Sequence, residues 1–415
     1  MQWEKMKYSS IPLSDFFGHL SVGQLKSMKY TSRAKKFFAV TLSVAYLTLV
    51  FSCSSSRSQD IRLTTDPLYM EIKKSGQELT VKNNVPGAAV ALIRDGEIAW
   101  IQSIGYADLA SKKPVTSETI YNIGSISKLI SAWGFMQLTE KDLVKLDDPV
   151  DPMLSRWHLP KSEFDKSKVT LRRILSHTAG LSVHGYGGSD QGTPLLSLEE
   201  SLNGKTKRNG ETVHLISEPG TKWDYSGGGF TIAQLLLEEK TNESFSTYMK
   251  NNIFLPLGMK HSSYDWTEEM MANSATAYDE NGNPVKNRVF TEKAAAGLQT
   301  TIKDLAHFAE LSITRDPKQL SKVLKPETIK LMETPVLPKS NEDESGLGYR
   351  FMNYEGFRTL GHTGENVGWS AALFLDLPTK SGIIVLCNGS NGDRVWFPIY
   401  QSWLKTLKMK NEFSK

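Results

Sequence analysis

The alternation of apolar and polar residues predicts that the folded part of the chain opens with a helix and a β-hairpin. Apolar residues at helical spacing predict a helix over residues 66–81. Two apolar runs follow, over residues 88–93 and 98–101, and Asp95-Gly96 lies between them. Asp-Gly between apolar runs is a strong signal for a tight hairpin turn. We therefore expect two adjacent antiparallel strands near the start.

The same pattern predicts strands again near the C-terminus. Apolar runs separated by Gly, Pro and polar residues predict strands over residues 348–354, 357–360, 369–377 and 382–387. A last helix over residues 395–408 carries aromatic and aliphatic residues at helical spacing. Strands at both ends with helices between them indicate an α+β fold with one antiparallel sheet completed by the two ends of the chain.

The middle of the chain is rich in loops and helices. Helices are expected over residues 127–141, 171–175, 230–240 and 305–311. We predict a single domain over residues 66–409, in which residues 66–145 and 291–409 form the α/β part. Residues 146–290 then form an inserted, mostly helical lobe.

The first 65 residues have the composition of a targeting segment. Basic residues precede a 15-residue apolar run, 37–51, which fits a secretory signal and is short for a membrane span of about 20 residues. Ser52 and Cys53 follow this run, and a Ser-rich stretch comes next. This resembles a bacterial lipoprotein signal, in which residues 1–52 are a leader, Cys53 is lipidated and residues 53–65 are a tether. A plain signal peptide and an uncleaved anchor are the alternatives, and either Met1 or Met28 can be the start.

Charge and cysteine content exclude some function classes. The net charge of +4 comes from the leader, where basic residues exceed acidic ones by five, so the rest of the chain is nearly neutral. No basic patch interleaved with aromatic residues favours a nucleic-acid partner. The second cysteine, Cys387, ends an apolar run and is expected to be a buried strand residue. The eight histidines lack metal-ligand spacing, so we expect no metal and no cofactor.

Three S-x-x-K tetrads are candidates for nucleophilic chemistry: Ser32/Lys35, Ser125/Lys128 and Ser402/Lys405. Residues three apart on a helix share a face, so a hydroxyl and an amine meet in one small volume, as an activated serine requires. Taken alone, each tetrad can also be a helix-capping serine and a solvated lysine. The other motifs around each tetrad therefore decide which serine is the candidate nucleophile.

Two further motifs stand at fixed distances from the middle tetrad. Tyr225 precedes three glycines and follows Ser125 by 100 residues. His362-Thr363-Gly364 follows Tyr225 by 137 residues and lies between two predicted strands. A fourth segment, Leu175-Ser176-His177-Thr178-Ala179-Gly180, contains a histidine that we interpret as structural.

In this order, the motifs resemble those of the serine β-lactamase-related hydrolases of the penicillin-recognising group. That group includes class C β-lactamases, D,D-peptidases, D-aminopeptidases and related esterases, with motifs S-x-x-K, Y-x-N and [K/H]-[T/S]-G. The resemblance spans about residues 66–405 and implies the β-lactamase/transpeptidase-like α/β/α sandwich.

The resemblance implies a role for each matching residue. Ser125 is the implied nucleophile that forms an acyl-enzyme, and Lys128 and Tyr225 are the implied proton-transfer pair. Either a neutral Lys128 or a Tyr225 phenolate held by a charged Lys128 can be the base. The backbone N–H groups of Ser125 and Glu365 are the implied oxyanion hole.

The third motif implies a substrate-binding strand. His362 and Thr363, with Gly364 beside them, are expected to face the bound carbonyl or carboxylate. Small residues there allow a substrate backbone to lie along the strand.

Three departures from the group's pattern bear on the substrate. Gly227 stands where the Y-x-N asparagine is usual, and His362 replaces lysine, which predicts weaker, pH-dependent carboxylate binding. Glu365 places a charge where a small residue is common, which is expected to disfavour anions or accept an amine. The first two favour a peptidase or esterase over an efficient β-lactamase.

The sequence therefore predicts an exported serine hydrolase of the bacterial cell envelope, anchored to the membrane as a lipoprotein. Its expected substrate is a small-molecule or peptide ester or amide, with D-amino-acid and peptidoglycan-derived compounds as candidates. The alternatives are a non-catalytic binding or scaffold protein of the same fold, and a weak class C-like β-lactamase. The sequence leaves the oligomeric state open.

Overall fold

A seven-stranded antiparallel sheet forms the centre of the folded region. The computed structural model describes residues 66–206, 210–337 and 344–413, of which 67–413 are treated below as one unit. The strand order is β10-β11-β12-β13-β1-β2-β3. Their bounds are β1 Gly87–Arg94, β2 Glu97–Asp108, β3 Lys113–Pro114, β10 Arg350–Tyr354, β11 Phe357–Asn366, β12 Trp369–Asp376 and β13 Ser381–Cys387.

The two ends of the chain meet in the middle of this sheet, as the sequence predicts. Strand β1 pairs with β13 over six residues, with Ala88 opposite Cys387. The β1–β2 hairpin turns at Asp95 and Gly96, both with positive φ, which is the backbone conformation that an Asp-Gly turn requires. Cys387 is buried, also as predicted.

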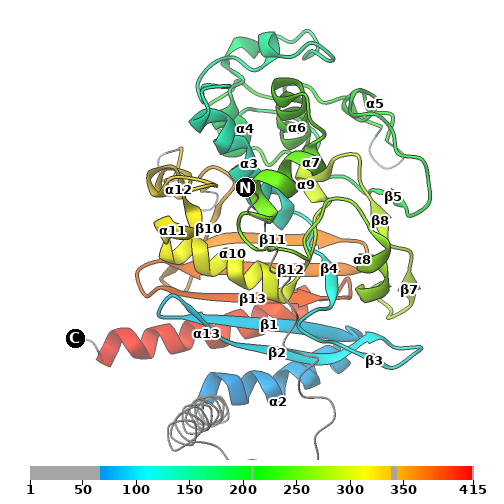
Figure 1. Cartoon of the computed structure of the whole chain (residues 1–415), viewed down its shortest axis with the longest axis vertical. Coiled ribbons are helices and arrows are strands. Elements are labelled where there is room, and N and C mark those ends of the chain that lie inside the picture. Colours follow the sequence, from blue (N-terminus) through cyan, green and yellow to red (C-terminus); the bar gives the residue numbers. More distant parts are fainter. Residues whose placement is uncertain (1–65, 207–209, 338–343, 414–415) are drawn as a thin grey trace, which may run out of the picture. The chain divides into compact units, whose positions relative to one another are not determined.

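Helices cover both faces of the sheet (Figure 1). Helices α2 (Pro67–Lys82) and α13 (Asp393–Phe413) pack on one face, and α10 (Ile302–Thr314) and α3 (Ile126–Glu140) pack on the other. All residues of β1 except Arg94 are consequently buried, which explains its unbroken apolar run. The predicted helices over 66–81, 127–141, 305–311 and 395–408 all occur, each displaced or extended by a few residues.

The segment between α3 and α10 is built of short elements, mostly helical. Its helices are η3 Asp151–Met153, η4 Lys166–Lys168, α4 Leu171–Leu175, α5 Leu198–Leu202, α6 Gly227–Thr241, α7 Phe245–Met249, η5 Lys250–Phe254, α8 Glu268–Asn273 and α9 Lys293–Ala296. Small strand pairs join them: β5 Ser189–Asp190 with β8 Arg288–Val289, and β6 Ala277–Tyr278 with β7 Pro284–Val285. Helices α11 (Pro317–Leu320) and α12 (Pro326–Met332) follow α10.

Two predicted boundaries are wrong. Helix α6 begins at Gly227, three residues before the prediction, because Ser226 caps it by accepting a hydrogen bond from Gly229 N at 3.0 Å. The His362-Thr363-Gly364 motif lies inside β11, not between strands. Gly361 and Gly364 interrupt the apolar pattern there, so the sequence did not predict a continuous strand.

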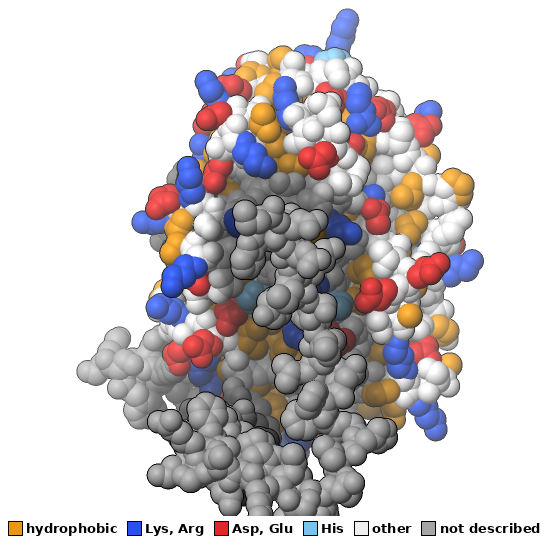
Figure 2. Space-filling view, in the orientation of Figure 1, with side chains coloured by type: hydrophobic (Ala, Val, Ile, Leu, Met, Phe, Trp, Pro, Cys, Tyr) orange, Lys and Arg blue, Asp and Glu red, His pale blue; other side chains and the backbone are white. Residues whose placement is uncertain are grey.

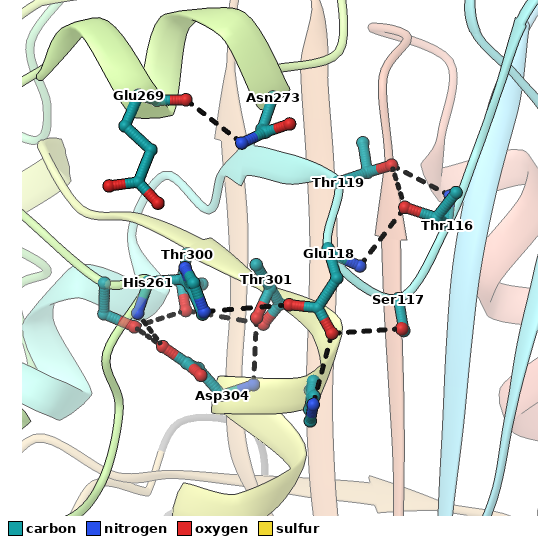
Figure 3. Close-up of polar contacts among 12 residues, drawn as sticks. Thr116, Ser117, Glu118, Thr119, His261, Glu269, Asn273, Thr300, Thr301 and Asp304 are labelled. Carbon is teal, nitrogen blue, oxygen red and sulfur yellow. Dashed lines mark hydrogen bonds and ion pairs between the residues drawn. The ribbon is translucent and has the colours of Figure 1, made fainter. Parts of the chain in front are cut away.

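The segment that leads to Ser125 is fixed by a second small sheet and a polar cluster (Figure 3). Strand β4 (Ile120–Asn122) pairs with β9 (Gln299–Thr301), and Thr301 caps α10 by accepting from Asp304 N at 3.0 Å. The buried Asp304 carboxylate accepts from the N–H of His261 at 2.7 Å and from the hydroxyl of Ser262 at 2.9 Å. Burial raises the pKa of Asp304. These bonds hold the β4–β9 pair in place just before the candidate nucleophile.

None of the helices in the described ranges has the length and apolar content needed to cross a bilayer. On the face drawn in Figure 2, acidic and basic side chains are interspersed.

Candidate active site

Ser125 and Lys128 lie at the N-terminal end of α3, as the middle tetrad predicts. Gly124, with φ of +51°, turns the chain from β4 into the helix. Lys128 Nζ lies 3.0 Å from Ser125 Oγ and donates a second hydrogen bond to the carbonyl oxygen of Ala295 in α9, at 2.7 Å. The structure therefore fixes the amine directly against the hydroxyl.

The amine of Lys128 is buried without a carboxylate partner among the described residues. Its side chain is 1% exposed, and its Nζ lies over the rings of Tyr225 at 4.9 Å and Phe230 at 5.9 Å. Ring faces attract a cation only weakly compared with a carboxylate. The hydrogen-bond partners of the amine are therefore the Ser125 hydroxyl and the Ala295 carbonyl, not a carboxylate.

Aromatic rings hold Tyr225 at the wall of the same cavity. His177 stacks on it with ring centroids 4.2 Å apart, and His184 lies on it at 4.7 Å. His177 is buried, and its Nδ1 accepts a hydrogen bond from Ser226 N at 3.1 Å. Burial, with the charges of Lys128 and Arg350 nearby, lowers the pKa of His177 well below its usual value. His177 is therefore a neutral packing partner of Tyr225, in line with its interpretation as structural.

His362 is also held in its neutral form, while its expected role in binding a carboxylate stays a prediction. Its side chain is 2% exposed, and its pKa lies well below the usual value, first because of burial and then because of the charge of Arg350. Its Nδ1 donates to the carbonyl oxygen of Thr363 at 2.5 Å, so Nε2 carries a lone pair. No described residue bonds to that buried Nε2. His362 thus offers the cavity a hydrogen-bond acceptor, 6.1 Å from Tyr225 between ring centroids.

Two glycines bring the nucleophile segment against β11. A Cβ on Gly364 would lie 1.9 Å from the carbonyl oxygen of Ile123 and 2.9 Å from Ser125 N. A Cβ on Gly124 would lie 2.5 Å from Glu365 N. Only glycine allows this approach, which brings the backbone at Ser125 close to the backbone at Glu365, the two residues whose N–H groups are the implied oxyanion hole.

All the predicted site residues of the folded region border one cavity of about 420 Å³. These residues are Ser125, Lys128, Tyr225, His362, Thr363, Gly364 and Glu365. The structure thus brings together motifs far apart in the sequence, while their catalytic roles stay predictions. Cys53 lies outside the described residues.

The carboxyl group of Glu365 lies away from the nucleophile. Glu365 pairs with Ser370 in β12, and the Ser370 hydroxyl bonds to Trp396 of α13 at 3.0 Å. Paired residues in antiparallel strands share a sheet face, so the Glu365 side chain is on the α13 face. Burial and the charge of Asp393 at the start of α13 raise the pKa of Glu365. The backbone of Glu365, not its charge, therefore faces Ser125.

The other two tetrads differ in context. The hydroxyl of Ser402, on α13, donates to Glu71 of α2 at 2.6 Å, on the opposite face of the sheet. Ser32 and Lys35 lie outside the described residues. Ser125 is accordingly the tetrad serine that the structure places in a cavity.

The sequence reasoning missed Arg350 and Asn366, which line the cavity. Arg350 opens β10 and pairs with Gly361, and its guanidinium group lies 5.1 Å from the centroid of the Trp223 ring. Asn366 ends β11. The signal that could have found Arg350 is a basic residue at the start of the strand that pairs with the histidine motif.

The departure at Gly227 also has a structural reason. A Cβ there would lie 3.1 Å from the carbonyl oxygen of His184, 3.3 Å from the Tyr186 ring and 3.4 Å from Gly185. The loop from His184 to Tyr186 therefore occupies the space where a side chain at position 227 would begin. The Tyr186 hydroxyl is hydrogen-bonded to Thr231 of α6 at 3.0 Å, which holds the loop there.

Comparison with known families agrees with this geometry. The Beta-lactamase family profile matches residues 71–402. The chain belongs to the beta-lactamase family. This family consists of serine hydrolases, and its fold, a mixed sheet and helix β-lactamase/transpeptidase-like architecture, confirms the predicted fold class.

Similar proteins include penicillin-binding protein homologues. This family member is 23% identical to Protein flp of Staphylococcus aureus over 317 residues, 74% of this chain and 60% of that protein. It is 28% identical to Penicillin-binding protein 4* of Bacillus subtilis over 187 residues, 45% of this chain and 39% of that protein. The chain thus spans about 60% of the length of the flp proteins that it matches.

Solved structures of the same fold are also similar. The octameric penicillin-binding protein homologue from Pyrococcus abyssi has a TM-score of 0.69 and 26% identity, covering 81% of this chain and 77% of that one. D-alanine carboxypeptidase AmpC from Burkholderia cenocepacia has a TM-score of 0.67 and 20% identity, covering 82% and 99%. At that identity the second likeness shows the fold alone.

Proposed function

We propose that this chain is a serine hydrolase that forms an acyl-enzyme on Ser125 and cleaves an ester or peptide amide. The observation that carries the proposal is the 3.0 Å contact between Ser125 Oγ and Lys128 Nζ inside the cavity of about 420 Å³. Membership of the beta-lactamase family supports it.

The contacts of Lys128 support a direct role in proton transfer. When Lys128 is neutral, one N–H bonds to the Ala295 carbonyl and its lone pair can take the Ser125 proton. Oγ then attacks the substrate carbonyl carbon, and the resulting oxyanion is held by the N–H groups of Ser125 and Glu365. Collapse of this intermediate breaks the bond to the leaving group, which receives the proton. Water repeats the sequence, and the acid is released from Ser125.

Tyr225 is the second proton-transfer group of the proposal. Its ring lies against Lys128, and neutral His362 offers an acceptor on its other side. Tyr225 can deliver the proton to the leaving group, or act as the base if Lys128 remains charged.

Arg350 supports a substrate with a carboxylate on the leaving group. It is the lining cation other than Lys128 among the described residues, since His362 is neutral. A planar guanidinium group can hold a carboxylate with two parallel hydrogen bonds. Similar proteins are named penicillin-binding proteins and D-alanine carboxypeptidases, which supports a D-amino-acid or peptidoglycan-derived substrate. We propose a carboxypeptidase-like or esterase activity rather than efficient β-lactam hydrolysis.

The same names and the leader pattern support a location in the bacterial cell envelope. We propose that the protein is exported and held at the membrane through lipid on Cys53.

A labelling experiment with an activity probe tests the enzyme proposal. A fluorophosphonate or a fluorescent penicillin is expected to label the folded wild type, and Ser125→Ala to abolish labelling. Lys128→Ala is expected to slow labelling by about 10²–10⁴-fold, because it removes the group that takes the proton. Ser402→Ala, from another tetrad, is the matched control and keeps the wild-type rate. Absence of labelling of the folded wild type by both probes would instead favour a non-catalytic binding protein.

A panel of substrates tests which class of compound transfers its acyl group to Ser125. Intact-mass detection of an acyl-enzyme against esters, D-amino-acid peptides and β-lactams is expected to show adducts with the first two classes, and a β-lactam adduct that is hydrolysed only slowly.

A further inference from the structure

The implied oxyanion hole takes its two N–H groups from two separate segments of the chain. Ser125 follows strand β4 and the turn at Gly124, whereas Glu365 lies near the end of β11. These segments are not paired as strands, because β4 pairs with β9, and β11 pairs with β10 and β12. Their backbones nevertheless come close, since a Cβ on Gly364 would lie 2.9 Å from Ser125 N. A strand ladder therefore does not hold the two segments together.

A pair of asparagine side chains joins these segments instead. Asn122, the last residue of β4, accepts a hydrogen bond at its Oδ1 from Gly124 N at 3.0 Å. The same oxygen accepts from Nδ2 of Asn366, the last residue of β11. In the described ranges, no other hydrogen bond joins β11 to the segment from β4 to Lys128.

The carbonyl oxygen of Ala296, in α9, connects a third segment to the pair. It accepts from Nδ2 of Asn366 at 3.1 Å and from Nδ2 of Asn122 at 3.5 Å. The residue before it, Ala295, accepts the hydrogen bond of the Lys128 amine. The two asparagines thus connect the turn before the nucleophile, the end of β11 and the helix that bonds to the amine.

Backbone groups fix the orientation of each amide. A backbone N–H only donates, so the Asn122 oxygen faces Gly124 N. A carbonyl only accepts, so Asn366 turns its nitrogen toward Ala296. Asn122 is 3% exposed, and Asn366 is half-buried on the wall of the cavity. Turning either amide away would leave a buried polar group without a partner, so the connection is rigid.

We propose that Asn122 and Asn366 are positioning residues, which hold the Glu365 N–H at the distance from Ser125 that the oxyanion needs. In this role the side chains act through the backbone of Gly124 and the end of β11. This inference rests on the proposed acyl-enzyme function and deepens it. Donors aimed at a developing negative charge matter most in the transition state. Loosening them therefore lowers the rate of acylation rather than the affinity for the reactant.

Fluorophosphonate labelling over a range of concentrations separates these two quantities, as a maximum rate (kinact) and a half-saturating concentration (KI). Asn366→Ala and Asn122→Ala are each expected to lower kinact by about 10–100-fold and to leave KI nearly unchanged. A misplaced donor costs less than a lost one, which costs about 10²–10³-fold. The double variant is expected to be about as slow as the slower single variant, because both side chains act through one hydrogen bond. Asn281→Ala, in the exposed turn between β6 and β7, is the matched control and keeps both wild-type values.

The pH dependence of labelling distinguishes this role from an effect on the amine. Lys128 keeps its bonds to Ser125 and Ala295 in both variants, since neither asparagine contributes to them. The pH at which labelling is half-maximal is therefore expected to stay at the wild-type value. A displaced midpoint would show that the substitutions act through the amine, and would overturn the inference.

Urea denaturation checks that each variant is folded. A wild-type kinact in folded Asn366→Ala, a loss confined to KI, or additive losses in the double variant would also overturn the inference. If Asn122→Ala does not fold, Asn366→Ala carries the test by itself, since its side chain is half-buried at the end of a strand. All these outcomes leave the acyl-enzyme proposal standing as long as the wild type is labelled. A folded wild type that neither the fluorophosphonate nor the penicillin labels would overturn both.

Discussion

The residues around Tyr225 illustrate how burial changes the chemistry that a residue type suggests. Histidine in the third motif suggested a partly charged group, yet His362 is buried beside Arg350 and is neutral. His177 and His184 also have lowered pKa values, chiefly through burial. A cation at any of these three positions would repel both Lys128 and Arg350. The three histidines therefore add no positive charge to the cavity.

Neutral His177 makes stability depend on pH. Below about pH 6.5 the unfolded chain binds a proton at this residue and the folded chain does not, so the free energy of unfolding falls as pH falls, by about 1.4 kcal/mol per pH unit. His177→Gln is expected to be less stable than the wild type at pH 7.5 but to have a slope shallower by that amount between pH 6.5 and 5. Urea denaturation at several pH values measures both.

Controls for this prediction come from the same chain. Buried Glu292 and Asp304 have raised pKa values and titrate in the opposite sense, but they do so equally in both proteins. Identical slopes for wild type and His177→Gln would contradict the prediction.

At the scale of elements, the loop from His184 to Tyr186 and the first turn of α6 fit together. The loop fills the space beside Gly227, and Gly227 N and Gly228 N donate to the carbonyl oxygens of His184 and Val183 at 3.0 Å each. The absence of a side chain at position 227 is therefore matched by a loop that packs directly against this turn of the helix.

Restoring the asparagine is expected to harm the protein. Gly227→Asn would force its Cβ against His184 and the Tyr186 ring, and such overpacking costs about 1–3 kcal/mol of stability. Denaturant unfolding measures this loss, and Gly227→Ala, which adds only the Cβ, is expected to lose less. Nitrocefin hydrolysis is expected to stay low in all three proteins. Turnover comparable to a class C enzyme, or an asparagine variant as stable as the wild type, would contradict this account.

The fold was largely predictable because it follows from local patterns. Alternating apolar runs, the Asp95-Gly96 turn and helical spacing identified the strands and helices at both ends. The missed features depend on contacts between distant segments. Arg350 reaches the site only because β10 pairs with β11, and the Asn366 amide is oriented by Ala296 and Asn122, residues 70 and 244 positions away. The glycines of α6 and β11 give no apolar signal, so the boundaries there were misplaced.

At the scale of the whole molecule, the proposed lipid anchor predicts that Cys53, and not Cys387, carries the lipid. Labelled palmitate is expected to attach to the protein in a bacterial host, and Cys53→Ser to abolish the label. Cys387→Ser is the matched control, because Cys387 is buried at the end of β13 and is expected to leave labelling unchanged. Mass spectrometry of the purified N-terminal peptide gives an independent reading. A wild type that incorporates no palmitate would exclude the lipoprotein hypothesis.

The pairing of β1 with β13 has a consequence for the order of events in the cell. Gly87 N donates to Asn388 Oδ1, 301 positions later, so the centre of the sheet closes only when nearly the whole chain is available. At about 5–20 residues per second, synthesis leaves β1 without its partner for roughly 15–60 seconds. During that time Ser125 also lacks the Glu365 N–H beside it. The nascent chain therefore cannot complete the proposed active site. Until β13 is made, the edge of β1 that does not pair with β2 is an open apolar edge, which favours aggregation.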